Sequence, residues 1–198
     1  MNLPITPSKT AVLLTPFLVC IPLALAGWDE TSGLAYDRVA IAEQGQVWRL
    51  FTAHWVHTHP AHAALNLAAW PLIFGLAHTE LPLRHWALAT LVCVLGVDAG
   101  LWWGAPGVAW YVGLSGVLHG LWALAALAVW RRERVLAGAM LLGIAAKLYW
   151  EQTQGAAPGS EAWIGHRVIV DAHGYGALAG LLYGIALHSR KRALPGRD

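Results

Sequence analysis

Six long apolar segments follow one another along the chain, with polar stretches between them. They cover approximately residues 10–27, 60–78, 85–103, 113–130, 135–151 and 167–188. A helix needs about 20 mostly apolar residues to cross the hydrocarbon core of a bilayer, and each segment reaches or approaches that length. The pattern therefore predicts an all-α, multi-pass membrane protein with six transmembrane helices, forming a single domain over residues 1–198.

The composition agrees with a membrane environment. Hydrophobic residues make up 57% of the chain and charged residues only 12%, whereas soluble globular domains carry about 25% charged residues. Many of the 12 tryptophans lie near the ends of apolar segments, where indole favours the interface between lipid and water. The net charge is only +2, and the basic residues cluster in short loops rather than on one face. We therefore expect contact with membrane lipid and no nucleic-acid partner.

The basic residues predict the orientation of the six helices. If the amino terminus is cytoplasmic, the cytoplasmic set is Lys9, Arg84, Arg131, Arg132, Arg134, Arg190, Lys191, Arg192 and Arg197, and the opposite set is Arg38, Arg49, Lys147 and Arg167. Lysine and arginine are enriched in cytoplasmic loops of membrane proteins. The bias therefore predicts that both termini are cytoplasmic.

A serine and a histidine lie inside apolar segments. Ser115 occurs in Gly113-Leu114-Ser115-Gly116 at the start of the fourth segment, and His173 lies near the start of the sixth. Polar groups at membrane depth are costly and usually mark a site, and a serine beside a histidine base can become a nucleophile. With the predicted orientation, both residues lie in the outer half of the bilayer.

The second segment places two further polar residues at the same depth. His62 and Asn66 are four residues apart, so they project from one face of a helix. Each side chain can donate a hydrogen bond to a negatively charged oxygen, which is what an oxyanion hole requires.

Small residues predict that the fourth and sixth helices pack closely. His173 shares a helix face with glycines at 176, 180 and 184, and the fourth segment has Gly116 and Gly120 next to Ser115. Stripes of small residues let membrane helices approach one another closely, which a hydrogen bond between Ser115 and His173 would need.

Together these residues resemble the rhomboid intramembrane serine proteases. The matching pieces are Trp48-Arg49, His62 with Asn66, Gly113-Leu114-Ser115-Gly116, and Ala172-His173 followed by Gly176 and Gly180. The resemblance implies the six-helix rhomboid fold and a Ser115–His173 dyad without an acidic third member. It further implies an oxyanion hole formed by His62, Asn66 and the backbone N–H of Ser115, and it implies no cofactor. The expected substrate is the transmembrane helix of another protein, cleaved near its outer end.

The residues after Ser115 resemble one branch of that family. Many rhomboids carry a tyrosine where this chain has His119, and the string from Gly113 to Gly120 is similar to the rhombosortases. The resemblance implies processing of exported proteins that carry a carboxy-terminal Gly-Gly sorting tag. It also implies a bacterial inner-membrane location with the active site open to the periplasmic side. We expect His119 to pack beside Ser115 and His173 rather than act as the base.

Two acids in apolar segments need separate explanations. Asp98 lies in the third segment, where the default expectation is an interhelical hydrogen bond. Asp171 is only two residues before His173, about 200° away around the helix, so it is badly placed to orient the histidine ring.

Other functions remain as alternatives. The chain could be a general rhomboid protease of other clients, or a non-catalytic rhomboid-like escort, although both Ser115 and His173 are present. A more remote alternative is a metal-binding membrane transporter, because histidines cluster at positions 54, 57, 59 and 62. Pro60 interrupts that cluster and the HExxH pattern of zinc proteases is absent from the sequence. We therefore expect no metal site.

Overall fold

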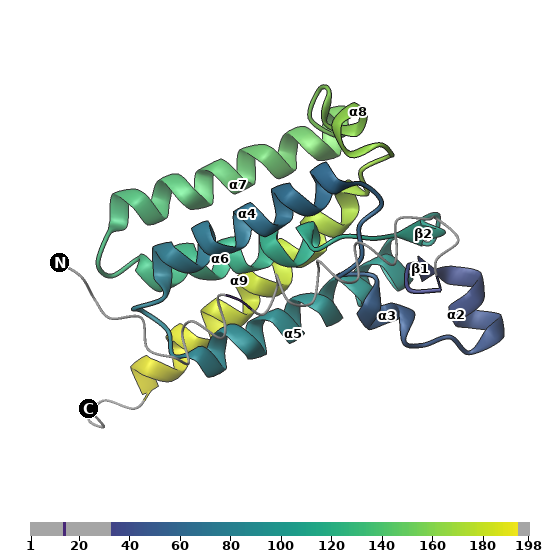
Figure 1. Cartoon of the computed structure of the whole chain (residues 1–198). Coiled ribbons are helices and arrows are strands. Elements are labelled where there is room, and N and C mark those ends of the chain that lie inside the picture. Colours follow the sequence, from purple (N-terminus) through teal and green to yellow (C-terminus); the bar gives the residue numbers. More distant parts are fainter. Residues whose placement is uncertain (1–13, 15–32, 194–198) are drawn as a thin grey trace.

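The structure is a computed structural model that describes residue 14 and residues 33–193. In this part of the chain, long helices form a bundle, and shorter elements gather at one end of it (Figure 1). The expected first helix, residues 10–27, lies outside the described residues except for Leu14.

The long helices coincide with the five later apolar segments. They are α4 (Pro60–Ala77), α5 (Leu83–Ala99), α6 (Ser115–Val129), α7 (Arg134–Gln154) and α9 (Val170–Ala193). A short π-helix, η1 (Gly100–Gly104), continues α5. The observed bounds differ from the expected ones by a few residues at most ends, which is ordinary at helix termini because the last turns are weakly determined.

Length and composition allow two described stretches to cross a membrane. Among the described residues, α4 and the continuous stretch Leu83–Gly104 are long and apolar enough to cross a membrane, and α6 is apolar but shorter. Large apolar side chains are exposed on the surface of several helices, as expected for a lipid-facing surface. Examples are Leu72, Leu91, Leu95, Leu142, Leu178, Leu182 and Ile185. The mostly helical fold and these apolar surfaces indicate a membrane protein, and the six-crossing layout is part of the proposal below.

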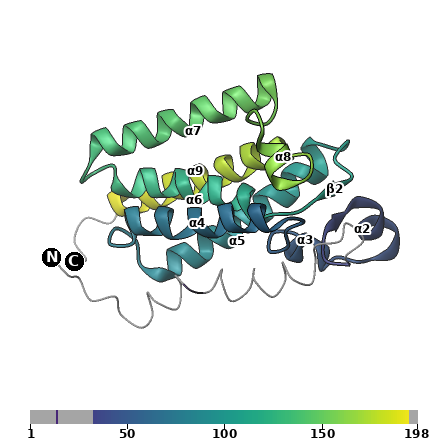
Figure 2. The same ribbon diagram turned by 45° about the horizontal axis from the view of Figure 1, so that its top comes forward.

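The helix α6 lies at the centre of the bundle. It packs on α4, α5, α7 and α9, and its contact with α9 is the most extensive between any two described elements. In both views α7 lies at one edge and α5 toward the opposite edge, with α6 and α9 between them (Figures 1 and 2). Residues on different faces of α6 therefore meet different helices of the bundle.

Facing glycines explain the close contact between α6 and α9. A Cβ atom on Gly176 would overlap the backbone carbonyl of Gly116, and a Cβ atom on Gly180 would overlap that of Gly120. The two backbones thus touch directly, without intervening side chains. This is the geometry that small-residue stripes permit between membrane helices.

A small outer region covers the end of the bundle at which α6 begins. Its strands β1 (Tyr36–Asp37) and β2 (Trp110–Tyr111) pair antiparallel, and its short helices are α2 (Arg38–Gln44), α3 (Arg49–Thr52) and α8 (Ser160–Ile164). Arg49 is buried and donates hydrogen bonds to the carbonyl of Ala35 at 2.7 Å and to Gln46 at 2.6 Å. The ring N–H of Trp48 donates to the carbonyl of Gly33 at 2.9 Å, so the Trp48-Arg49 pair ties the start of α3 to the segment before β1.

The segment that leads into α6 is held from several sides. The N–H of Gly113 donates to the carbonyl of Ala53 at 2.9 Å, and the Tyr111 hydroxyl donates to the carbonyl of Gly113. The ring of His54 lies edge-on to Tyr111, and its Nε2 donates to Asp98 at 3.2 Å. The expected interhelical bond of Asp98 is therefore made to the loop before α4 instead. That loop thereby joins α5 to the start of α6.

Candidate active site

Ser115 and His173 are hydrogen-bonded to each other. Ser115 is the first residue of α6, and its Oγ lies 2.9 Å from Nε2 of His173, which lies in the first turn of α9. His173 is 4% exposed, whereas Ser115 is half-buried. The close contact of the two helices thus places a hydroxyl and an imidazole at the distance needed for proton transfer.

The other nitrogen of His173 meets an acid. Its Nδ1 lies 2.9 Å from Oε2 of Glu151, which lies in the last turns of α7 and is also 4% exposed. An ionised carboxylate can only accept, so Nδ1 carries the proton, and Nε2 of the neutral ring then accepts from Ser115. The structure thus adds a carboxylate beside the expected pair of Ser115 and His173. Asp171 could not fill this place from the same helix, and the acid comes instead from α7.

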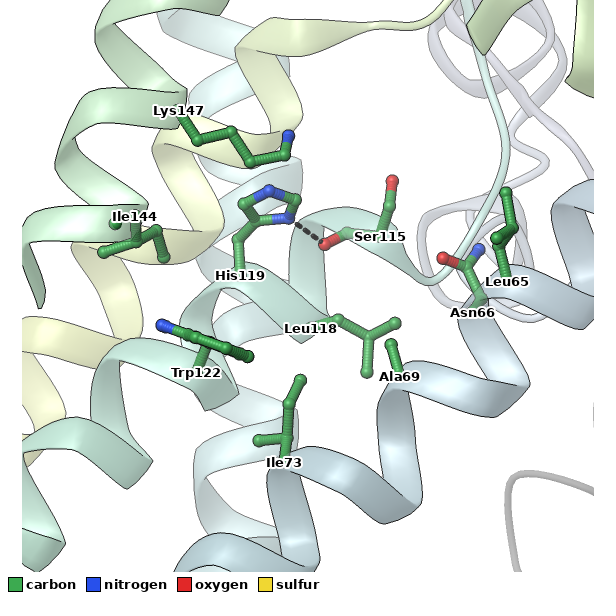
Figure 3. Close-up of a pocket in the computed structure, with 11 residues that line it drawn as sticks. Leu65, Asn66, Ala69, Ile73, Ser115, Leu118, His119, Trp122, Ile144 and Lys147 are labelled. Carbon is green, nitrogen blue, oxygen red and sulfur yellow. Dashed lines mark hydrogen bonds between the residues drawn. The ribbon is translucent and has the colours of Figure 1, made fainter. Parts of the chain in front are cut away.

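Lys147 and His119 complete the surroundings of this chain of bonds. Lys147 precedes Glu151 by one turn of α7 and forms an ion pair with its Oε1. The ring of His119 stacks on that of His173, with centroids 4.1 Å apart and planes 11° from parallel. The Nδ1–H of His119 donates to the backbone carbonyl of Ser115 at 2.7 Å (Figure 3). His119 therefore packs beside His173, and its bonded nitrogen is occupied by the backbone rather than by the serine hydroxyl.

The histidines at positions 54, 57, 59 and 62, on which the remote metal-binding alternative rests, do not gather into a ligand set among the described residues. His54 bonds Asp98 and His57 bonds Asn66. Within the described residues, the metal-compatible group is instead His119, Glu151 and His173, whose ligand atoms lie within 4.8 Å of one another. The Lys147 ammonium already neutralises the only carboxylate of that group.

Asn66 lies close to Ser115 and is held by a histidine. It is 5% exposed on α4 and lines the same cavity as Ser115. Its Nδ2 lies 2.8 Å from Nε2 of His57 in the loop before α4. Burial lowers the pKa of His57 to about 4, although the backbone of Trp55 acts in the opposite direction. His57 is therefore neutral at pH 7 and can accept one amide proton of Asn66, which leaves the second amide proton for another acceptor.

His62 lies against the glycine that precedes the serine motif. Gly113 has a φ of 113°, a conformation that favours glycine, and a Cβ there would come within 2.8 Å of Nε2 of His62. The His62 ring also meets those of His57 and His166 edge-on, at centroid distances of 4.9 and 5.8 Å. His62 and Asn66 thus share one face of α4, as their spacing predicts, and this face is turned toward the start of α6.

A cavity of about 380 Å³ opens beside Ser115, between α4, α6 and α7. Figure 3 shows Lys147, His119 and Ser115 around the upper part of the cavity, with Leu118, Trp122 and Ile73 below them. The polar residues are Asn66, Ser115, His119 and Lys147, and the large apolar ones are Leu65, Ile73, Leu118, Trp122 and Ile144. The cavity can therefore hold an apolar side chain next to the serine hydroxyl.

Sequence reasoning missed two residues of α7. Lys147 and Glu151 are an ionisable pair at i and i+4 in an apolar segment, and intramembrane ionisable residues are candidates for function by default. The sequence therefore marked both residues as candidates. It did not show that Glu151 meets His173, because no spacing rule connects Glu151 to a histidine in α9.

The family of the chain follows from a sequence comparison. The family model described as the rhomboid domain matches residues 44–190. No curated protein matches the chain in a sequence comparison. The matched range contains every residue of the candidate site, from His57 to His173, and covers well over half of the chain. The chain therefore belongs to the rhomboid family, whose members are intramembrane proteases and rhomboid-like proteins.

Proposed function

We propose that this protein is an intramembrane serine endopeptidase with Ser115 as nucleophile and His173 as general base. The observation that carries the proposal is the 2.9 Å hydrogen bond between Ser115 Oγ and His173 Nε2 beside a cavity. A serine within hydrogen-bond reach of a histidine, oriented in turn by a third group, is the arrangement that activates a hydroxyl for acyl transfer. The site geometry agrees with this role, and the family assignment makes proteolysis the expected chemistry.

The proposed reaction has two halves, acylation of Ser115 and hydrolysis of the acyl ester. Ser115 Oγ attacks the scissile carbonyl carbon while its proton passes to His173 Nε2, and a tetrahedral intermediate with a negative oxygen forms. His173 then gives that proton to the departing amine as the peptide bond breaks. In the second half, water loses a proton to His173 and attacks the acyl ester, and Ser115 regains its hydrogen.

The proposed oxyanion hole consists of His62, Asn66 and the backbone N–H of Ser115. Asn66 lines the same cavity as Ser115, and its amide nitrogen keeps one proton that His57 does not accept. Ser115 begins α6, and the first N–H groups of a helix have no partner within the helix. Such preorganised donors favour the charge that develops in the transition state.

The cavity supports a transmembrane helix as the substrate. It lies between α4 and α7, which each pack on α6, and its apolar part suits an apolar substrate side chain. In this proposal the helices cross the membrane six times with both termini cytoplasmic, the inner membrane is bacterial, and the site opens to the periplasmic side. Cleavage then falls near the outer end of the substrate helix.

We further propose that the substrates carry carboxy-terminal Gly-Gly sorting tags. The support is the string from Gly113 to Gly120 and the histidine at position 119, which stacks on His173. Such a tag consists of a Gly-Gly motif, an apolar helix and a basic end. The enzyme would release the exported protein or pass it on to further processing.

The test measures cleavage of two membrane-bound reporters, each co-expressed with the protein. One ends in a Gly-Gly motif, an apolar helix and a basic tail, and the other is a generic type I membrane protein. We expect the wild type to cleave the first, and Ser115→Ala and His173→Ala to leave it intact. His119→Ala tests whether the other histidine beside Ser115 is the base, and it should retain part of the cleavage.

The outcomes separate the alternatives. Cleavage of only the generic reporter would contradict the sorting role and support a general rhomboid protease. If a folded wild type cleaves neither reporter, the endopeptidase proposal is wrong and a non-catalytic escort is favoured. Cleavage that survives His173→Ala but not His119→Ala would place the base on α6.

A further inference from the structure

We propose that Glu151 is a positioning residue that completes a Ser115–His173–Glu151 triad, with Lys147 fixing the carboxylate. This inference rests on the proposed function, because it assigns a role within the same reaction. It concerns a helix, α7, that supplies neither the nucleophile nor the base.

The contacts of Glu151 leave its carboxylate little freedom. Oε2 accepts from Nδ1 of His173 at 2.9 Å, and Oε1 pairs with the ammonium of Lys147. Glu151 and His173 are each 4% exposed, whereas the Lys147 side chain is 46% exposed at the cavity. A carboxylate bonded through both oxygens to different groups cannot rotate without losing one of them.

The bond from His173 to Glu151 selects the reactive tautomer. With Nδ1–H donating to the carboxylate, the Nε2 lone pair faces the Ser115 hydroxyl and can take its proton. Without an acceptor at Nδ1, the other tautomer becomes available, and its Nε2–H would point at the serine oxygen. That tautomer cannot act as the base.

The carboxylate also stabilises the imidazolium that forms during the reaction. When Ser115 gives up its proton, His173 becomes positively charged at a buried position, where an uncompensated charge is strongly unfavourable. Glu151 lies 2.9 Å away with the opposite charge. The proton on Nδ1 stays on the ring throughout, so Glu151 orients and stabilises without being protonated.

Lys147 explains how a carboxylate can be ionised at this depth before the reaction begins. In the resting state His173 is neutral, so the negative charge of Glu151 needs another partner. The ion pair with Lys147 supplies it from one turn earlier in the same helix. A metal ion on His119, Glu151 and His173 would instead compete with this ammonium and displace the Nδ1–H contact.

The experiment measures kcat and KM for the cleaved reporter with the purified full chain in liposomes. Glu151→Gln should lower kcat by at least about 100-fold, toward the roughly 10⁴-fold loss known for a triad acid changed to its amide, with little change in KM. Glu151→Asp keeps the charge on a shorter side chain and should recover part of the lost kcat. The matched control is Glu80→Gln, which removes a carboxylate from the Arg132 ion pair and should leave kcat unchanged.

A double variant separates positioning from simple charge balance. The double variant Glu151→Gln with Lys147→Gln replaces the ion pair by two neutral side chains, so no uncompensated ammonium remains. If the ion pair were purely structural, this replacement would restore activity together with stability. We expect kcat to stay as low as in Glu151→Gln alone, while the melting temperature recovers. Recovery of kcat in the double variant would overturn the triad.

Other outcomes are also decisive. The triad is wrong if Glu151→Gln stays within threefold of the wild-type kcat, or if Glu151→Asp is no better than Glu151→Gln at equal thermal stability. Loss of wild-type activity with a chelator would favour a metal on the same residues. Failure of the proposed function itself is separate, because then wild type and Ser115→Ala would both leave the reporter intact.

Discussion

The contact between α6 and α9 predicts a large effect from adding a single methyl group. In Gly176→Ala, the new Cβ would overlap the carbonyl of Gly116, which belongs to backbone and cannot rotate away. The helices would have to separate by roughly 1 Å to restore ordinary van der Waals contact. Overpacking of this kind costs about 3 kcal/mol at the upper end of its usual range, and the higher helix propensity of alanine returns about 1 kcal/mol. We therefore expect a net loss of about 2 kcal/mol.

The same separation should impair catalysis. Ser115 and His173 lie on these two helices and are joined by the 2.9 Å bond, and a misplacement of about 1 Å at a reacting pair can cost about 100-fold in rate. The assay combines thermal unfolding in detergent with reporter cleavage. A loss of about 2 kcal/mol corresponds to a fall in melting temperature of roughly 4–8 °C for a chain of this size.

Gly138→Ala is the matched control for this prediction. Gly138 is also helical, but a Cβ there meets nothing within 4 Å, so alanine should leave activity unchanged and stability equal or slightly higher. If Gly176→Ala melts and cleaves like Gly138→Ala, α6 and α9 do not touch through their glycines, and the reasoning fails.

Three further predictions concern the cavity, the serine turn and the loop before α4. Gly143→Leu places a side chain in the cavity beside Ser115 and should lower kcat/KM about tenfold or more, because it excludes the substrate side chain. An unchanged kcat/KM in the cleavage assay would contradict the proposed substrate position. Gly113→Ala forces a side chain into a backbone with φ 113° and against His62, so it should destabilise by about 2 kcal/mol or more, and a wild-type melting curve would refute this. The pKa of His57 is about 4 in the folded protein against an ordinary 6.5. As pH falls, the His57 ring is therefore protonated in the unfolded chain before it is protonated in the folded protein. Folding stability is then lost as pH falls from 6.5 toward 4, by at most about 3 kcal/mol. His57→Gln should flatten that part of the curve of melting temperature against pH, and an identical slope in both proteins would show that His57 does not titrate in this way.

The pattern of apolar residues predicted the five long helices because each is a long, mostly apolar run. The bounds of α4 and α6 agree with the expected segments to within two residues. The outer region was harder to predict, because β1 and β2 are two residues each and pair across a long separation in sequence. Such pairing depends on tertiary contacts, such as the buried Arg49, and not on local propensity.

The pairing of Ser115 with His173 could be predicted because both residues share their helix faces with glycines. The contact with Glu151 could not, because its approach to His173 depends on how α7 leans on the rest of the bundle. Asn66 is an intermediate case. Its face was predictable from the spacing to His62, but its hydrogen bond to His57 requires the loop before α4 to fold back over the helix.

The residues that build the site also weaken the signal by which a transmembrane helix is predicted. Within α7, Lys147 and Glu151 lower the mean hydropathy of the segment, and α7 is not among the described helices apolar enough to cross a membrane by that measure alone. In the folded protein the two charges pair with each other, and Glu151 meets His173 instead of lipid. Their cost in the membrane is therefore smaller than a sum over separate residues implies, because that sum treats each charge as unpaired. An ionisable pair within an otherwise apolar helix is thus the place in this fold where a partner for a buried histidine should be sought first.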